Sequence, residues 1–314
     1  MYYPYFRGKQ FELITIREMA ERIAAAGFVP IIEPVKEALK GLEKTFQAIC
    51  DAQGRAIVIV NPYHGDHQED GAGITELLQT SYIGNEAISA GILLRSNMTL
   101  AQATAACEAH KGHNPTFVHA GFTSQKSLAE YLGGDLPTSQ HVFIEEHANT
   151  LYRKHFEGCK RILVRDGFKR LKNAEYAKVP LEEFSELHLT YSSDLNMAGF
   201  GDFLTVGDSY SESGGPAYAV AIHLTFIDPD KDDVMYIYHF VSTTNDTPTD
   251  PAGKFAQALK KLIDKLNAGD SKLRETDAIK EFRDLHAKGH FPGLGYVKKL
   301  SMKHHIETLA DYLG

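Results

Sequence analysis

The sequence predicts a (β/α)8 barrel of the TIM type, with an irregular closure, a late antiparallel hairpin and a C-terminal helical segment. Short apolar runs recur every few dozen residues, most end in a polar or ionisable residue, and helical patterns follow them. Strands that alternate with helices form a parallel sheet with helices outside it, and about eight such units make a barrel. The predicted strands are 2–6, 28–34, 56–62, 89–96, 116–122, 140–147, 160–168 and 200–207.

The first units show this pattern most clearly. Tyr2–Phe6 is short and β-prone, and the turn Arg7–Lys9 leads into apolar residues at helical spacing that stop at Gly27. The near-continuous apolar run that follows suits a strand covered on both faces. A helical stretch over 38–52 then leads to the third run, and the next four runs repeat the unit. Right-handed crossovers of this kind return the chain parallel to the preceding strand.

The end of the chain departs from this regularity. The stretch 181–197 has a helical pattern, and the eighth strand is only weakly indicated. Two stronger β segments, 217–227 and 234–242, are separated by an Asp/Pro/Lys turn and predict a hairpin. From Pro251 onward the pattern is helical. The predicted organisation is therefore a barrel over 1–250, which includes the hairpin 217–242, and a helical segment over 251–314 packed on it.

Composition excludes several classes of protein. Of the 314 residues, 43% are hydrophobic and 24% charged, which is the balance of a soluble globular protein. The net charge of −8 argues against general binding of duplex nucleic acid, although a local basic pocket remains compatible with it. The 3 cysteines lack the spacing of a disulfide framework or a zinc ribbon. No stretch has the length of a membrane span, so we expect a cytoplasmic protein without membrane partners.

The barrel reading also predicts where a site should lie, because barrel chemistry gathers at the C-terminal ends of the strands. Both carboxylates and cations follow the predicted strands. This mixture suits a phosphorylated or otherwise anionic ligand, a nucleotide included, handled by acid/base groups with or without a metal. The candidate catalytic residues are Glu33, His119, Glu145 and Asp166, and the candidate ligand-binding residues are Arg7, Lys9, Asn61, His64, Arg95, Arg165 and Asp202.

The four candidate catalytic residues lie in or at the ends of apolar strands, where an ionisable group is costly unless it is paired, ligated or functional. The structural alternative is a salt bridge, and Glu145 with Arg165 would form one across neighbouring strands. A divalent metal is a further alternative. Oxygen-rich ligation would favour Mg²⁺ or Mn²⁺, whereas added histidine ligands would admit Zn²⁺ or Fe.

Two loops and one strand pair complete the candidates. The turn Arg7–Lys9 lies between a strand and a helix, where two cations and helix N-terminal amides hold an anion, or where exposed salt bridges form instead. The loop 61–70 is the densest group of ligand-type residues, with His64 the best candidate and a solvated loop the alternative. His223 and His239 face each other across the predicted hairpin, and we expect packing and hydrogen bonds to satisfy them.

Three short motifs give the chain a family resemblance. They are the N-terminal MYYPYFRGKQFE, the segment IIEP at 31–34 and the segment GDF at 201–203. With these motifs the chain resembles the bacterial and phage "beta protein" families. The resemblance implies a barrel-like protein of prophages and bacterial defence neighbourhoods, sometimes beside a predicted nuclease. It carries over Arg7, Lys9, Glu33 and Asp202 as motif positions and assigns no reaction to them.

Two functional hypotheses follow. In the first, the protein is a cytoplasmic component of an antiphage system that binds a phosphate-bearing ligand and hydrolyses it, as a phosphodiesterase-like or metal-assisted hydrolase. Arg7, Lys9 and Arg95 would bind the anion, while His119, Glu145 and Asp166 would supply acid/base groups or metal ligands. In the second, the barrel is a non-enzymatic sensor or scaffold for a nuclease partner.

Overall fold

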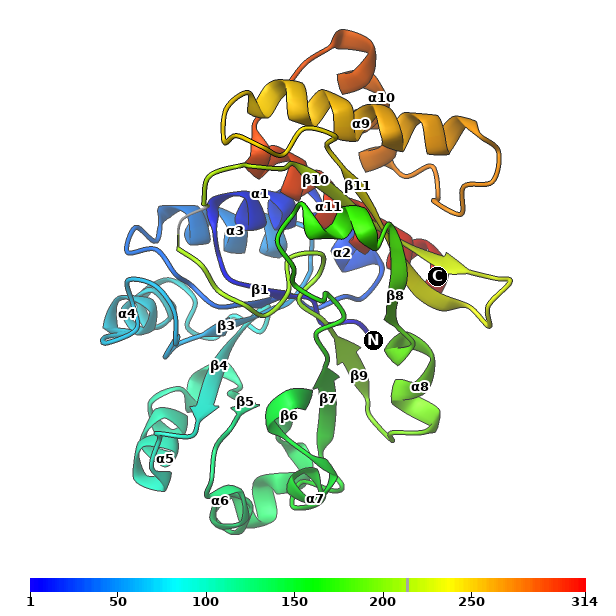
Figure 1. Cartoon of the computed structure of the whole chain (residues 1–314). Helices are drawn as coiled ribbons and strands as arrows, with labels where there is room; N and C mark the ends of the chain where they lie inside the picture. The colour runs from blue at the N-terminus through cyan, green and yellow to red at the C-terminus, as the bar shows by residue number, and fades with distance from the viewer. Residues whose placement is uncertain (213–214) are drawn as a thin grey trace. The chain divides into compact units, whose positions relative to one another are not determined.

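The computed structural model describes residues 1–212 and 215–314. The chain divides into two compact units, each built on its own sheet (Figure 1). Unit 1 comprises Met1–Asp166 and Thr190–Phe203, and unit 2 comprises Gly167–Leu189 and Leu204–Gly314. Both units are therefore discontinuous in sequence, and residue 250, where we placed the end of the barrel, lies inside unit 2.

Unit 1 contains the predicted barrel. Its eight-stranded sheet has the order β1-β2-β3-β4-β5-β6-β7-β9, and each neighbouring pair is parallel. This order is the one that successive right-handed crossovers produce. The strands are β1 Tyr5–Phe6, β2 Ile31–Ile32, β3 Ala56–Ile59, β4 Ile88–Arg95, β5 Thr116–Ala120, β6 Gln140–Ile144, β7 Lys160–Val164 and β9 Gly199–Gly201.

Helices follow the strands around the outside of this sheet (Figure 1). α3 illustrates why they form: it buries Leu42, Phe46 and Ile49, which recur at helical spacing on one face. The helices are α1 Gln10–Glu18, α2 Ala20–Ala25, α3 Lys40–Asp51, α4 Ala72–Ser81, α5 Leu100–Ala109, α6 Gln125–Leu132 and α7 Thr150–Lys154, with 3₁₀ turns η1 Lys111–His113, η2 Gly133–Thr138 and η3 Glu145–His147.

Much of the barrel interior is filled by side chains that lie two residues apart along a strand. Ile57 and Ile59 of β3 belong to this cluster, as do Val142 and Ile144 of β6. Successive side chains of a strand point to opposite faces, so this register decides which later residue on each strand faces the interior. The same rule fixes which polar residues reach the C-terminal end of the barrel from inside.

Backbone contacts join β1 to β9 and nearly close the barrel. Tyr2 and Phe200 form an isolated parallel bridge. The amide of Tyr3 donates to the carbonyl of Phe200 at 2.7 Å, and the amide of Tyr5 donates to the carbonyl of Asp202 at 2.9 Å. β1 and β9 are not paired as regular strands in the sheet order, so this seam is held by fewer contacts than the rest of the barrel.

Side chains reinforce the seam. The Tyr2 hydroxyl donates to the Asp202 carboxylate at 2.7 Å, and both residues are buried. Gly201 makes the close approach possible, because an added Cβ there would stand 2.1 Å from the Tyr3 carbonyl oxygen. Tyr2 also packs edge-on against Phe28, with ring centroids 5.1 Å apart. Removing either the glycine or the Tyr2–Asp202 hydrogen bond would therefore weaken closure.

The irregular closure was predicted, but two of its elements differ from expectation. The eighth barrel strand lies at Gly199–Gly201, so it overlaps only the start of the predicted run 200–207. The stretch 181–197 is not wholly helical: β8 covers Leu181–Ser185 before α8 covers Leu187–Ser193. Buried Phe184 and Leu187 are three residues apart and imitate a helical face, whereas β8 forms through long-range pairing with β11.

Unit 2 contains a three-stranded antiparallel sheet of order β10-β11-β8. β10 Ala221–Asp228 and β11 Val234–Val241 form the predicted hairpin. The 3₁₀ turn η4 spans Glu175–Lys178. Three helices complete the unit: α9 Pro251–Asn267, α10 Asp277–Lys288 and α11 Leu294–Leu313. Among the described residues, no helix has both the length and the apolarity needed to cross a membrane.

The hairpin histidines are satisfied within unit 2, as expected. The Nδ1 atoms of His223 and His239 are 2.7 Å apart, and Nε2 of His239 lies 3.2 Å from a Glu182 carboxylate oxygen. The rings of Phe168 and Tyr176 pack against the pair. Burial lowers the pKa of both histidines. A hydrogen bond between two Nδ1 atoms requires that at least one of them is unprotonated.

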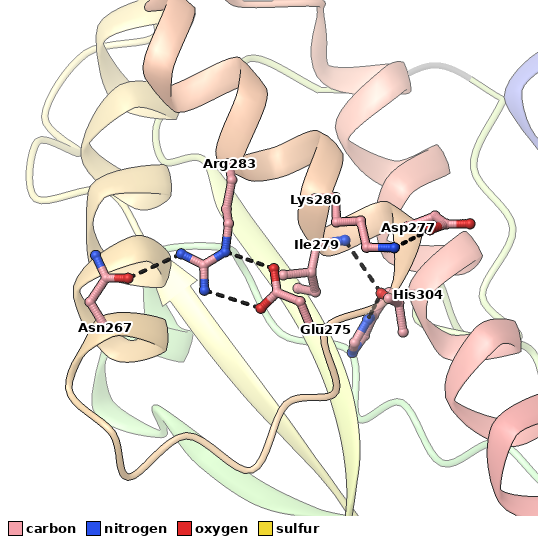
Figure 2. Close-up of polar contacts among 8 residues, drawn as sticks. Asn267, Glu275, Asp277, Ile279, Lys280, Arg283 and His304 are labelled. Atoms are coloured by element: carbon pink, nitrogen blue, oxygen red, sulfur yellow. Dashed lines mark hydrogen bonds and ion pairs between the residues drawn. The ribbon is translucent and has the colours of Figure 1, made fainter.

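A second buried histidine organises the start of α10 (Figure 2). The Thr276 hydroxyl accepts from the Ile279 amide and lies 2.7 Å from Nδ1 of His304, whose Nε2 lies 2.9 Å from the Thr225 carbonyl oxygen. Beside them, Arg283 donates to both Glu275 and Asn267. Nε2–H donates to the carbonyl oxygen, which fixes one proton of the imidazole. Burial lowers the pKa of His304 to about 4.

We predict that Tyr2→Phe loosens the barrel seam. The substitution removes the hydroxyl that donates to the buried Asp202 carboxylate, and losing one partner of a buried hydrogen bond costs about 1–3 kcal/mol. Hydrogen exchange should therefore accelerate at the Tyr3 and Tyr5 amides, which bond across the seam. The control is Tyr131→Phe, which removes an exposed hydroxyl bonded to Glu108. Equal effects of the two variants on these amides would contradict the role of Tyr2.

We predict that unit 2 loses stability as the pH falls from 6.5 toward 4. The His304 pKa is near 6.5 when unfolded and about 4 when folded, so the unfolded chain binds more protons in this window. The contribution, on the order of 2–3 kcal/mol, is complete above pH 6.5. Exchange of the α10 amides, measured across this range, should show the loss. His304→Gln should reduce the pH dependence, with His223 and His239 contributing the remainder, whereas exposed His286→Gln should leave it unchanged.

Candidate functional site

We define the mouth of the barrel as the C-terminal ends of its strands. The register of the interior directs polar side chains to it, with Glu146 after Ile144 and Asp166 after Val164 in addition to the four described next. Arg7 follows Tyr5, Glu33 follows Ile31, Asn61 follows Ile59 and Arg95 follows Leu93, in each case two residues after an interior side chain. The structure therefore brings these four predicted residues together at one end of unit 1.

Glu33 is the centre of this group. Its side chain is fully buried, and its carboxylate accepts from the Tyr5 hydroxyl at 3.0 Å, the Tyr63 amide at 2.8 Å, the His64 amide at 3.1 Å and the Arg7 guanidinium. A buried charge is tolerated only when it is paired and hydrogen-bonded. Glu33 meets both conditions, so it holds the mouth together and has little capacity left for acid/base chemistry.

Arg7 is positioned by the core as well as by Glu33. Its guanidinium lies over the rings of Tyr5 and Phe203, at 4.9 Å and 5.2 Å from their centroids. Its amide donates to the carboxylate of Glu12 in the first turn of α1. The next residue, Gly8, has φ +63°, and an added Cβ would stand 2.8 Å from the Glu33 carbonyl oxygen. The predicted basic turn is thus packed onto β2, while Lys9 beside it is partly exposed.

The loop 61–70 is anchored rather than loosely solvated. The Asn61 side chain accepts from the Leu93 amide at 2.8 Å and donates to the Leu93 carbonyl at 2.9 Å, which extends the pairing of β3 with β4. Gly65 packs so closely that an added Cβ would stand 2.1 Å from the Val35 carbonyl oxygen. His67 is buried, with Nε2 3.0 Å from the Lys36 carbonyl oxygen. Asn61 is therefore occupied structurally rather than available to a ligand.

Arg95 differs from the other cations at the mouth. Its Nε is buried without a hydrogen-bond partner, and its guanidinium forms no ion pair within residues 1–212 and 215–314. The guanidinium lies over the ring of Tyr63, 4.6 Å from the centroid. Tyr63 itself is 47% exposed, although it carries a large aromatic ring. Arg95 is thus a positive charge held in place with hydrogen-bonding capacity to spare.

Glu145 and Arg165 form the salt bridge that the sequence offered as an alternative. Nε and Nη2 of Arg165 donate to the two carboxylate oxygens at 2.5 Å and 3.0 Å. Their side chains are 30% and 26% exposed, so solvent reaches the pair. Asp166, the next residue, is exposed and ends the first segment of unit 1. Arginine side chains pair with both Glu33 and Glu145 in this structure, and the divalent-metal alternative stays a prediction.

His119 does not lie at the mouth with these residues. Val118 belongs to the barrel interior, so His119 points to the outer face of β5, where it is fully buried beside Phe143 and Phe156. Its Nδ1 lies 2.7 Å from the Tyr152 hydroxyl in α7. Its Nε2 lies 2.9 Å from Nδ1 of His141. We expected His119 among the acid/base groups of the mouth, and the register of β5 removes it from that set.

His119 belongs to a series of buried side-chain hydrogen bonds in which each donor can be assigned. The Ser139 hydroxyl donates to the Leu136 carbonyl at 2.6 Å, so Nε2 of His141, 2.8 Å away, must donate to Ser139. Nδ1 of His141 then accepts from His119, which in turn accepts from Tyr152. Both imidazoles are neutral, because burial lowers the pKa of His141 to about 3 and that of His119 well below its usual range. These hydrogen bonds cross-link α7, β5 and β6.

Asp202 lies at the seam rather than among the interior residues of the mouth. Its neighbour Phe203 belongs to the interior cluster, and the Asp202 carboxylate instead meets the Tyr2 hydroxyl. Burial and the adjacent Asp202 carboxylate raise the Tyr2 pKa well above its usual value, so the hydroxyl stays protonated as a donor.

His64 contributes its amide to Glu33, and its ring lies 4.7 Å from that of Tyr63.

Comparison with known proteins adds no further constraint. A scan against protein-family models, a search of curated proteins and a search of solved structures each gave no match.

Two residues of the site were not singled out from the sequence. Tyr63 supports Arg95, and Glu12 binds the Arg7 amide. Tyr63 lies in the polar loop 61–70, and a large aromatic side chain in such a loop could have identified it as a candidate from the sequence. Glu12 lies three residues after Lys9, where a first-turn glutamate commonly reaches back to the backbone that precedes a helix.

We predict that Glu33→Gln destabilises unit 1. The substitution leaves the buried Arg7 guanidinium without its carboxylate partner, and breaking a buried ion pair in this way typically costs about 3–5 kcal/mol. Urea denaturation followed by hydrogen exchange at β2 and β3 would measure the loss. Glu43→Gln, which removes an exposed carboxylate from α3, should change stability by less than about 0.5 kcal/mol. A Glu33→Gln protein as stable as this control would show that the network carries little energy.

Proposed function

We propose that the mouth of the barrel binds a small anionic, phosphate-bearing ligand. The observation that carries the proposal is the state of Arg95. This residue ends β4, two residues after interior Leu93, and its guanidinium has no hydrogen bond or ion pair in the described parts of the chain. An arginine presents a planar set of donors that matches phosphate and carboxylate oxygens. Tyr63 holds this group by a cation–π contact that leaves its hydrogen-bond donors unused.

The neighbouring groups support binding more than hydrolysis. Glu33 is saturated by four donors, and His119 faces the outside of the barrel. A general acid or base needs a proton-transfer atom within reach of the ligand, and neither residue offers one at the mouth. We therefore favour a sensor or binding module over an enzyme.

Hydrolysis is the second candidate. The observation in its favour is the partial exposure of the Glu145–Arg165 pair, since a ligand that engaged Arg165 would release the Glu145 carboxylate. A phosphodiesterase-like or metal-assisted reaction would then use Glu145, with the exposed Asp166 beside it. Metal-dependent release of phosphate or nucleoside monophosphate, lost in Glu145→Gln, would establish this candidate over simple binding.

The biological setting is the second part of the proposal. The resemblance carried by Arg7, Lys9, Glu33 and Asp202 supports a cytoplasmic role in bacterial antiphage defence, beside a nuclease partner. In that setting, binding of an anionic signal at the mouth would control the partner. Co-purification of a nuclease in a fixed ratio, altered by the ligand, would support this role.

We predict that Arg95→Ala weakens binding of pyrophosphate by about 10- to 100-fold, because hydrogen bonds to a charged group are worth about 1.5–3 kcal/mol. Isothermal titration calorimetry measures the effect. The matched control is Arg55→Ala, which removes an exposed arginine just before β3, at the opposite end of the barrel strands. Equal affinity in the wild type and both variants would contradict an anion site at Arg95, as would failure of the wild type to bind.

A further inference from the structure

We propose that the ligand is a nucleotide, whose base stacks on Tyr63 while its phosphates bind Arg95. This inference rests on the proposed function and names the class of ligand for the same site. The two residues act as neighbouring recognition groups because the Arg95 guanidinium lies 4.6 Å from the centroid of the Tyr63 ring. A cation beside an exposed aromatic ring matches a molecule that carries both phosphate and a planar base.

The first argument is the exposure of Tyr63. Its ring is 47% exposed, although folding normally removes much of a large aromatic side chain from water. Its hydroxyl has no hydrogen-bond partner among the residues that the structure describes. Tyr131, which is 44% exposed, is different because its hydroxyl donates to Glu108 at 2.5 Å. Tyr63 therefore presents an open ring whose position is not explained by a polar contact of its own side chain.

The second argument is that the backbone beneath this ring is fixed. The amides of Tyr63 and His64 both donate to the buried Glu33 carboxylate. On one side of them Pro62 is buried, and on the other Gly65 packs against the Val35 backbone. A ring on a fixed backbone loses little entropy when it stacks on a ligand, which is the condition for efficient binding. A solvated loop would not provide this.

The third argument is that part of the Tyr63 ring surface stays open beside Arg95. The guanidinium covers part of the Tyr63 ring and the His64 ring lies beside it at 4.7 Å, tilted by 52°. A base can stack on the remaining open surface, and base–aromatic stacking is tolerant of base identity. The site should therefore prefer nucleotides over base-free phosphates while discriminating weakly among bases.

Calorimetry on the full chain tests this with ADP, GDP, UDP, pyrophosphate and adenosine. We expect the nucleoside diphosphates to bind roughly 10-fold or more tightly than pyrophosphate, and adenosine to bind most weakly. Tyr63→Ala should bring ADP close to pyrophosphate, whereas Tyr63→Phe should keep the difference. Exposed Tyr131→Ala, on α6, is the control and should leave all affinities unchanged.

Tyr63→Leu separates stacking from support of Arg95. Leucine keeps an apolar surface under the guanidinium but offers no aromatic ring, so it should preserve pyrophosphate binding and remove the preference for ADP. If the wild type binds ADP and pyrophosphate equally and Tyr63 substitutions change neither, the nucleotide inference is overturned and the anion site stands. If the wild type binds neither, or Arg95→Ala changes neither, the proposed function fails as well.

Discussion

The mouth of this barrel depends on one buried carboxylate. Glu33 receives donors from β1, from the basic turn that follows it and from the loop after β3, so a single side chain ties three segments of unit 1 together. Burying a carboxylate is unfavourable unless such donors converge on it, and their convergence in turn fixes the backbone that carries them. The exposed ring of Tyr63, and through it the position of Arg95, are consequences of this arrangement.

The alternation of side chains along each strand then divides the polar residues into two layers. Side chains that point into the barrel, such as Glu33 and Arg95, reach the mouth. Those that point outward, such as His119 and His141, are buried between the sheet and its helices, where the neutral imidazoles hydrogen-bond to each other. The outer side chains cross-link β5, β6 and α7, while the inner group lies at the mouth of the barrel.

Much of the fold was predictable because apolar runs and helical spacing are local signals. The order of the barrel strands, the hairpin and the C-terminal helices all follow from them. β8 was missed because Phe184 and Leu187 share a spacing that suits a helix, and its pairing with β11 is long-range. His119 was assigned to the mouth because the sequence shows that it lies near a strand end. The sequence does not show whether its side chain points into the barrel, which depends on the neighbouring residues that fill the interior. A shift of one residue moves a side chain to the other face. The pairing of Glu145 with Arg165 was foreseen as an alternative, since neighbouring strands bring such ends together.

A crystal structure of the protein with bound ADP would test the central claim most directly. The account predicts phosphate oxygens at about 2.7–3.2 Å from the guanidinium nitrogens of Arg95, with Glu33 still bonded to Arg7 and to the Tyr63 amide. Ligand bound elsewhere on unit 1, with Arg95 still resting on Tyr63 without a new partner, would contradict it.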